Sequence, residues 1–236
     1  PEVLKLETVP DPVPEPGEVR IRVRAASVNH LDLFVRQGMP GMKIPLPRIP
    51  GSDAAGEVEV IGTGVKGLKE GDRVTVNPGF SCGRCEFCAG GRASLCLAYH
   101  LLGEHGDGSY AEKVLVRVSS LHPLPAGMTF EDAAAFPLVG LTAWAMLVTK
   151  ARVQPGEDVL VVGAGAGVGV MCVQIAKLCG ARVLATAGSD AKLAKLKVLG
   201  ADILIRHGPG EAPFDKAVRE LTAKRGVDVV VDYVGK

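Results

Sequence analysis

An uncharged run over residues 159–176 constrains the fold most strongly, because it carries four glycines at alternate positions from Gly163 to Gly169. The run is long enough to cross a bilayer. However, an apolar strand, a tight glycine turn and a helix explain this pattern better than one membrane helix. The stretch therefore predicts the first strand, turn and helix of a βαβ unit.

Strands and helices continue to alternate after this run, and a helix over 130–150, opened by Thr129, precedes it. Apolar strands that alternate with helices predict a parallel sheet covered on both faces, as in a doubly wound dinucleotide-binding domain. The expected order is strand 158–162, helix 168–179, strand 182–186, helix 191–199, strand 202–205, helix 213–224 and strand 227–232.

The first part of the chain has a different pattern. Short runs at 19–24, 56–61, 72–76 and 111–118 alternate apolar and polar residues, and proline and glycine separate them. Such runs are typical of half-buried strands in a compact, mostly antiparallel β unit. We therefore expect an α/β protein with two domains, a β-rich one over 1–125 and a dinucleotide-binding one over 126–236.

Charge and composition exclude several classes of protein. The 236 residues include 27 Lys and Arg against 26 Asp and Glu, so no basic footprint for nucleic acid or an anionic membrane is present. No signal or transit peptide is evident at the start of the sequence. Small-molecule chemistry in the cytoplasm is the expectation.

Four of the six cysteines, Cys82, Cys85, Cys88 and Cys96, lie within fifteen residues. In a reducing compartment this spacing points to metal, and four thiolates suit a closed, structural Zn²⁺ site. An iron–sulfur cluster stays possible, because it takes four cysteines too. Core packing is the expected role of Cys172 and Cys179. We expect one structural Zn²⁺ in a lobe over residues 77–100.

The glycine turn is a candidate cofactor site. Glycines there let backbone amides approach a pyrophosphate at the positive end of the following helix. The strict G-x-G-x-x-G spacing is not met, since a pattern that ends at Gly169 puts alanine at the other two positions. The residues expected to bind the cofactor here are Ala164, Ala166, Gly167 and Val168.

The end of the second strand bears on the choice of nucleotide. An acidic residue there would hold the ribose hydroxyl of NAD, but the strand-end position is Ala187. Small Gly188 and Ser189, with Lys192 nearby, leave room for a 2′-phosphate and favour NADP(H). In the alternative, Asp190 reaches the ribose and selects NAD; it can also simply cap the next helix.

Together, the β unit, the cysteine lobe and the sequence "GLTAW" (140–144) before "QPGEDVLVVGAGAGVG" (154–169) resemble the medium-chain dehydrogenase/reductase superfamily. The resemblance implies a GroES-like catalytic domain joined to a Rossmann domain. It covers essentially the whole chain. Complete members have a strand before "PEVL" and about a third more chain after "VDYVGK", so we expect a fragment that lacks both ends. Family members are often dimers or tetramers.

The resemblance also implies where a catalytic zinc would bind. The three ligand positions of zinc alcohol dehydrogenases correspond to Asn29, Ser52 and Ala134, and the proton-relay position corresponds to Leu31. None of these residues matches a zinc ligand or the relay residue. The sequences "NxxD" and "GSD" are similar to the zinc-free quinone oxidoreductase branch.

This reading predicts hydride transfer from NADPH to a quinone, an enone or another conjugated carbonyl, which spreads the developing charge without a Lewis acid. Asn29, Asp32, Ser52 and Asp53 are the candidate catalytic residues. His30 and Thr142 are candidates for cofactor contact, and His105 and Tyr110 are weaker candidates for the cleft. Two alternatives stay open. One is an alcohol dehydrogenase that recruits metal through His30, Asp53 or His105, and the other is a cofactor-binding protein without turnover.

Overall fold

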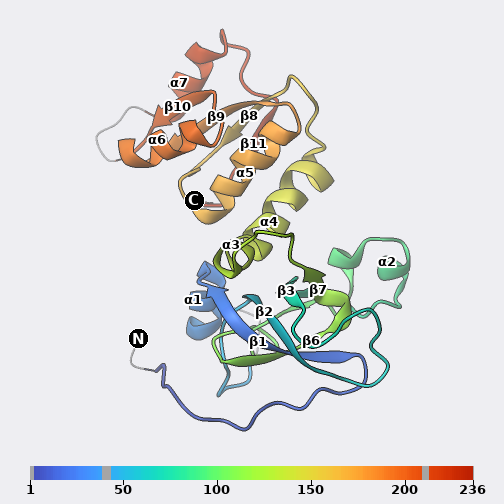
Figure 1. Cartoon of the computed structure of the whole chain (residues 1–236). Coiled ribbons are helices and arrows are strands. Elements are labelled where there is room, and N and C mark those ends of the chain that lie inside the picture. Colours follow the sequence, from blue (N-terminus) through green and yellow to red (C-terminus); the bar gives the residue numbers. More distant parts are fainter. Residues whose placement is uncertain (1–2, 39–43, 209–212, 236) are drawn as a thin grey trace. The chain divides into compact units, whose positions relative to one another are not determined.

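A computed structural model describes residues 3–38, 44–208 and 213–235 of the chain. Contacts within the chain divide it into two compact units, Pro1–Leu138 and Val139–Lys236. Figure 1 shows a β-rich first unit and a second unit in which helices alternate with strands. The prediction of an α/β protein with these two kinds of domain is confirmed.

A five-stranded antiparallel sheet, in the order β6-β1-β2-β3-β7, forms the first unit. Its strands are β1 (Glu18–Ser27), β2 (Asp53–Ile61), β3 (Arg73–Val76), β6 (Lys113–Arg117) and β7 (Leu121–Pro123). The alternation along β1 explains its two faces: Val19 and Ile21 are fully buried, whereas Arg22 points to solvent. The burial of alternate apolar side chains therefore fixes which face of the sheet covers the core.

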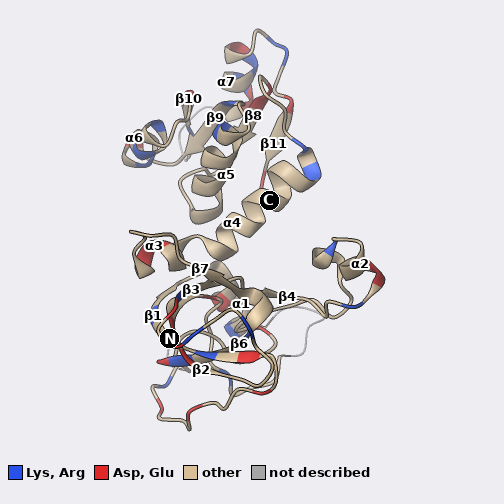
Figure 2. Cartoon of the chain, turned by 45° about the vertical axis from the view of Figure 1, so that its right-hand side comes forward, with Lys and Arg blue, Asp and Glu red and all other residues tan. Residues whose placement is uncertain are grey.

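Ion pairs cover the solvent face of β1 and β2. Arg20 Nε lies 2.8 Å from Glu59, Arg22 Nη2 lies 2.6 Å from the same carboxylate, and Arg24 Nη2 lies 2.7 Å from Glu57. Figure 2 shows both charges along these strands. Because such pairs are neighbours across an antiparallel ladder, they support the pairing of the two strands.

The helix expected over 130–150 is divided. Helix α3 (Phe130–Ala135) ends before Pro137, where α4 (Pro137–Trp144) begins, and a π-helical segment η3 (Ala145–Ala151) follows. Proline lacks the N–H that would continue the first helix and disfavours helical geometry at the residue before it. Helix α3 packs on β1, β2 and β3. The first compact unit thus extends past residue 125, where the sequence analysis put the domain boundary.

The second unit holds a four-stranded parallel sheet, in the order β10-β9-β8-β11. The strands are β8 (Asp158–Val161), β9 (Arg182–Ala187), β10 (Ile203–Arg206) and β11 (Val229–Val231); the helices are α5 (Gly167–Leu178), α6 (Asp190–Val198) and α7 (Phe214–Leu221). The strands and helices predicted after residue 158 are all present, with ends shifted by a few residues.

Alternate residues of each strand serve two cores. Val159 and Val161 of β8 pack with Val173 of α5 in one cluster, whereas Leu160 packs with Val218 of α7 in another. Helices therefore cover both faces of the parallel sheet, which explains why its strands are almost continuously apolar. This arrangement places the glycine-rich turn at the carboxyl end of β8.

The remaining elements of the first unit are short. The four-cysteine lobe contains β4 (Gly79–Phe80), α2 (Glu86–Ala89), η1 (Ala93–Leu95) and β5 (His100–Leu101), and β4 pairs only with β5. A helix α1 (His30–Gln37) follows β1, and a 3₁₀ turn η2 (Val118–Ser120) joins β6 to β7. Within the described parts of the chain, every helix is too short or too polar to cross a bilayer.

Candidate functional site

The glycine loop, residues 163–168, lies between β8 and α5 and is fixed to the end of β9. The backbone N–H of Gly163 donates to Thr186 Oγ1 at 2.9 Å, and the N–H of Ala164 donates to the Thr186 carbonyl oxygen at 2.8 Å. Thr186 is fully buried. No pattern in the sequence points to this threonine, because its role depends on the pairing of β8 with β9.

Close packing explains the glycines of this loop. Gly163 has a φ of +67°, a conformation that side chains with a Cβ rarely adopt. A Cβ on Gly169 would lie 2.5 Å from Ala164 Cα, and one on Gly165 would lie 2.7 Å from Lys192 Cδ. At Gly169 the loop and the start of α5 therefore approach each other too closely for a larger residue without a shift of the backbone, whereas the neighbour of Gly165 is a flexible lysine side chain.

The structure brings most of the predicted cofactor residues together. Ala166 and Gly167 are exposed at the start of α5, and Val168 is half-buried, whereas Ala164 is buried beneath the loop. The stem of Lys192 lies against the loop at Gly165. An exposed helix start with a cationic side chain beside it suits an anionic phosphate.

The end of β9 continues into α6 through Gly188 and Ser189. The Ser189 hydroxyl caps α6 by accepting from the N–H of Lys192 at 3.4 Å. The Asp190 carboxylate, which is highly exposed, lies 2.6 Å from Arg206 at the end of β10. The acidic group that could have selected NAD is thus paired with a guanidinium group.

Two other predicted cofactor residues lie elsewhere in the chain. His30 is exposed on α1, where its ring lies 6.3 Å from that of Phe34. Thr142 is half-buried on α4. The role of both residues in binding a cofactor stays a prediction.

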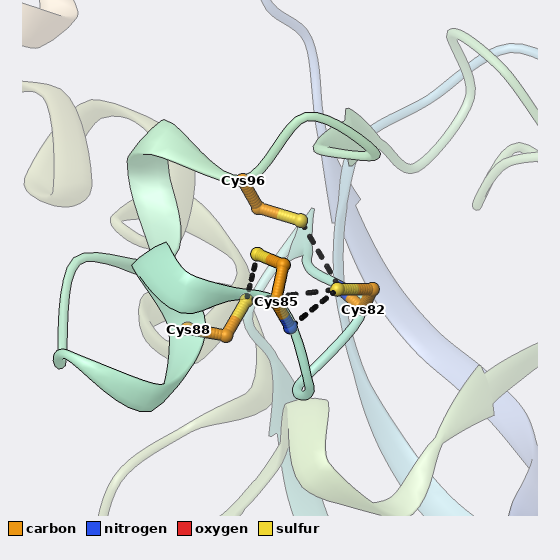
Figure 3. A group of neighbouring side chains, drawn as sticks. All are labelled: Cys82, Cys85, Cys88 and Cys96. Atoms are coloured by element: carbon orange, nitrogen blue, oxygen red, sulfur yellow. Dashed lines mark hydrogen bonds between the residues drawn. The ribbon is translucent and has the colours of Figure 1, made fainter.

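The four predicted metal ligands converge. The Sγ atoms of Cys82, Cys85, Cys88 and Cys96 all lie within 4.8 Å of one another, and Figure 3 shows them facing a common centre. In a tetrahedral Zn²⁺ site, neighbouring sulfur atoms are about 3.8 Å apart. Cys82 and Cys88 have 3.9 Å between their sulfur atoms, and Cys85 and Cys88 have 3.5 Å.

The backbone around these cysteines also favours thiolate. The N–H of Cys82 donates to Cys96 Sγ and the N–H of Cys85 donates to Cys82 Sγ, each at 3.3 Å. Hydrogen bonds from the backbone at Arg84 and Cys85 lower the pKa of Cys82 to about 6. In contrast, despite its backbone bond at Cys88, the pKa of Cys85 is raised to about 11, because burial and the neighbouring thiols outweigh that bond. Such N–H···S bonds orient ligands and favour the deprotonated form that binds metal. The donor set fits a closed four-thiolate site.

A polar cluster in the first unit contains three of the four candidate catalytic residues. Asp53 is fully buried at the start of β2. Its carboxylate accepts from Ser27 Oγ at 2.7 Å, from Asn29 Nδ2 at 2.8 Å and from the N–H of Leu138 at 2.8 Å. Burial raises the pKa of Asp53, and these three neutral donors oppose the rise. We call Ser27, Asn29, Asp32, Asp53 and Tyr110 the Asp53 cluster.

Asp32 forms the second half of this cluster. Its Oδ2 accepts from the N–H of Asn29 and from the Tyr110 hydroxyl, both at 2.7 Å. Burial and the bond to Asp32 raise the pKa of Tyr110 above its usual range, so the phenol stays protonated. Asn29 donates through Nδ2 to Ser27 Oγ at 3.3 Å as well as to Asp53. The donors of the cluster are directed at its two carboxylates.

Ser52 is outside this network. Its side chain is buried, and its hydroxyl donates to the Leu102 carbonyl oxygen at 2.9 Å. Ala134 is also buried and packs with Ala55 and Ala133. Among the described residues, the four cysteines are the only group of three or more His, Cys, Asp or Glu side chains placed to hold a metal. Asn29, Ser52 and Ala134 therefore offer no donor set that fits a catalytic Zn²⁺.

The alternative ligands are not gathered either. His105 Nδ1 lies 3.0 Å from Glu104, and its ring lies 6.0 Å from that of His100. Asp53 has its own partners in the polar cluster, and the His30 ring is tilted against that of Phe34 on α1. Within the described residues, these three side chains do not form a joint metal site.

Comparison with known families matches both parts of the chain. The sequence model of the alcohol dehydrogenase GroES-like domain matches residues 15–126, and that of the zinc-binding dehydrogenase family matches residues 167–236. A solved structure of an NAD-dependent alcohol dehydrogenase is 51% identical with a TM-score of 0.95 and is covered to 68% by this chain, of which 99% aligns.

Two curated relatives have different names. Acryloyl-coenzyme A reductase of Sulfurisphaera tokodaii is 39% identical over 98% of this chain and 66% of its own length. Quinone oxidoreductase of Rattus norvegicus is 35% identical over 99% of this chain and 63% of its own length. The chain spans between 60% and 67% of the length of the first relatives that it matches.

Proposed function

Because this chain belongs to the medium-chain dehydrogenase/reductase superfamily, we propose that it acts in an NADP(H)-dependent oxidoreductase that delivers hydride to a conjugated carbonyl compound without a catalytic zinc. A quinone, an enone or an α,β-unsaturated thioester belongs to this substrate class. The relatives named quinone oxidoreductase and acryloyl-coenzyme A reductase support the class.

One observation carries the proposal. The three positions that the resemblance assigns to catalytic zinc are occupied by an amide bonded to a buried carboxylate, a hydroxyl bonded to a backbone carbonyl and a methyl group. Without a Lewis acid, stabilising an alkoxide is difficult, whereas a conjugated acceptor distributes the charge over several atoms. Reduction of a conjugated carbonyl is thus the reaction that best suits these residues.

The Asp53 cluster serves this reaction by positioning. Asp53 orients the amide of Asn29 through Nδ2, and Asp32 fixes the backbone of the same residue through its N–H. Both amide hydrogens of Asn29 have acceptors in the cluster. We therefore propose that Asn29 is a rigid part of the wall of the site, with an amide dipole of fixed direction. When bound, NADPH supplies the hydride, and the chain's contribution is to hold the partners in reacting geometry.

The glycine loop and the residues after β9 support NADP(H). The exposed start of α5 suits the pyrophosphate, and Lys192 lies beside the loop. Arg206 forms an ion pair with Asp190, the acidic residue that could otherwise hold a ribose hydroxyl. Cationic side chains without an unpaired acid at this position favour a 2′-phosphate. The lobe holds one structural Zn²⁺ in this proposal, and the complete enzyme is a dimer or tetramer.

Alcohol dehydrogenase activity is the second candidate. It is favoured by the 51% identity to a solved NAD-dependent alcohol dehydrogenase over almost the whole of this chain. It requires a second metal site, and that requirement separates the two candidates.

Metal content and substrate preference test the proposal together. Elemental analysis of the full-length protein should give one zinc per chain, and NADPH should be consumed with quinones, enones or an enoyl thioester but not with simple aldehydes. Two zincs per chain with oxidation of primary alcohols would establish the second candidate. Tight NADPH binding without turnover on any of these compounds would support a non-catalytic role.

A further inference from the structure

The segment after β11 returns to the glycine loop through Tyr233. Its hydroxyl donates to the carbonyl oxygen of Gly163, the first glycine of the loop. The ring is half-buried and packs against the core on the α5 side of the sheet. The hydroxyl oxygen lies 2.5 Å from the position that a Cβ on Gly169 would take. One side chain therefore contacts the first glycine of the loop and lies beside the first turn of α5.

The same oxygen also lies beside the first turn of α5, close to Gly169. Burial raises the pKa of Tyr233, so the phenol keeps the proton that it donates to Gly163. The first turn of a helix leaves its N–H groups without intrahelical partners. In this turn, the N–H of Ala166 donates to the Gly163 carbonyl oxygen at 3.2 Å, and the Tyr233 oxygen lies beside Gly169.

Two donors of that turn stay available. Among the described residues, no acceptor lies opposite the N–H groups of Gly167 and Val168. Both residues are at least partly exposed, whereas Gly169 is buried. The turn thus has an inner donor at the buried Gly169, beside the phenol, and an outer pair at the more exposed Gly167 and Val168.

We propose that Tyr233 is a positioning residue for the dinucleotide, whose hydroxyl holds the glycine loop so that the N–H groups of Gly167 and Val168 receive the pyrophosphate. The inference rests on the proposed binding of NADP(H). Thr186 fixes the start of the loop to β9, and Tyr233 fixes the same glycine from the side of β11. A loop held from both sides loses little freedom when the cofactor binds.

The test begins with Tyr233→Phe, which keeps the ring and its packing and removes only the oxygen. The dissociation constant of NADPH, measured by calorimetry on the full-length protein, should rise roughly three- to tenfold, the equivalent of one hydrogen bond. Tyr99→Phe is the matched control, because Tyr99 is a partly buried tyrosine of the first unit, and it should leave the constant unchanged.

A fragment of the cofactor separates positioning from general structural damage. 2′-AMP carries the adenine, the ribose and the 2′-phosphate but no pyrophosphate, so its affinity should be the same in wild type and Tyr233→Phe. Equal losses for NADPH and 2′-AMP would mean that the variant disturbs the whole nucleotide site, and this outcome would overturn the inference. Equal NADPH affinity in both proteins would overturn it as well.

Amide exchange in the wild type needs no variant. Without cofactor, the N–H of Gly169 should exchange slowly and that of Gly167 rapidly, and NADPH should slow exchange at Gly167 and Val168. Rapid exchange at Gly169 in the free protein would contradict the division of donors. If the wild type binds neither NADPH nor NADH, the proposed function itself fails, which is a result distinct from each of these.

Discussion

The four-cysteine lobe and the glycine loop are both short segments built for a ligand, but the protein supports them differently. The lobe consists of elements of two to four residues, and among its cysteines only Cys96 is buried. The glycine loop lies on a parallel sheet with a core on each face and is tied by Thr186 and Tyr233. We infer that the lobe needs its metal for its shape, whereas the loop is shaped by the fold before any cofactor binds.

Two buried aspartates, one in each unit, also differ in the groups that surround them. Asp53 has only neutral donors, so burial dominates and its pKa is raised. Asp158, at the start of β8, accepts from Arg182 Nε at 2.5 Å and from Arg225 Nη2 at 2.9 Å, and these bonds lower its pKa. Burial raises the pKa of both carboxyl groups, and the net shift is reversed only at Asp158, where the donors are cationic.

Removal of one cysteine ligand from the four-cysteine lobe should have the largest effect of the changes considered, and this effect falls on the first unit. Cys88→Ser leaves three thiolates, and the zinc affinity should fall by more than roughly 100-fold because an inner ligand matters more than an outer one. Elemental analysis should find the metal lost, and amide exchange should show residues 79–101 unprotected. The NADPH dissociation constant should change little.

Cys179→Ser is the control for that variant, since Cys179 lies at the end of α5 and outside the lobe. It should keep one zinc per chain. A Cys88→Ser protein with full protection across the lobe would show that the lobe is shaped by its own packing, and the contrast drawn above would be lost.

The glycine loop should instead be sensitive to added volume. Gly169→Ala puts a Cβ 2.5 Å from both Ala164 Cα and the Tyr233 hydroxyl oxygen, so backbone must move. The free energy of unfolding should fall by about 1–3 kcal/mol in urea denaturation. Gly188→Ala should change it by less than about 0.5 kcal/mol, because its nearest neighbour would be 3.6 Å away. Equal stability of the two variants would contradict the close approach.

The charge of Asp158 should stabilise the second unit at neutral pH. Because its pKa is lowered on folding, this stabilisation exists above the ordinary aspartate pKa of about 4 and is lost as pH falls below it. Asp158→Asn should therefore cost about 1–1.5 kcal/mol at pH 7 and less at pH 3, as measured by urea denaturation. This figure allows for the partial exposure of both arginines.

Asp190→Asn is the matched control for the charge of Asp158. Asp190 pairs with Arg206, but its side chain is 82% exposed, so its loss should cost about 0.5 kcal/mol or less. Equal losses in the free energy of unfolding at pH 7 would show that burial does not strengthen the ion pairs of Asp158.

The smallest effect should come from the Asp53 cluster, with the opposite dependence on pH. A raised pKa means that Asp53 favours folding below the ordinary aspartate range and that this contribution is lost as pH rises through the folded pKa. Ser27→Ala removes a donor that opposes the rise. It should cost about 1 kcal/mol at pH 7.5 and less at pH 4.

Ser52→Ala provides the comparison, because Ser52 donates to the uncharged carbonyl oxygen of Leu102. Its cost should be independent of pH over the same range. A pH-independent cost for Ser27→Ala as well would show that Asp53 does not titrate in response to its donors.

The sequence by itself determined the fold class and the metal lobe. Apolar strands that alternate with helices after residue 158 can bury their side chains only in a covered parallel sheet, and the structure has that sheet. The spacing of the four cysteines brings their sulfur atoms within 4.8 Å of one another. Both are local patterns, in which neighbours along the chain carry enough information to fix the geometry.

Tertiary structure alone decided which polar groups meet. Tyr110 reaches Asp32 from 78 residues away, and Tyr233 reaches Gly163 from 70 residues away. Likewise, Ser52 and Asp53 are adjacent in sequence, yet alternation along the strand sends them to different partners. Contacts across such distances follow from strand order and register, and no periodicity in the sequence encodes them, because each depends on how separate elements pack.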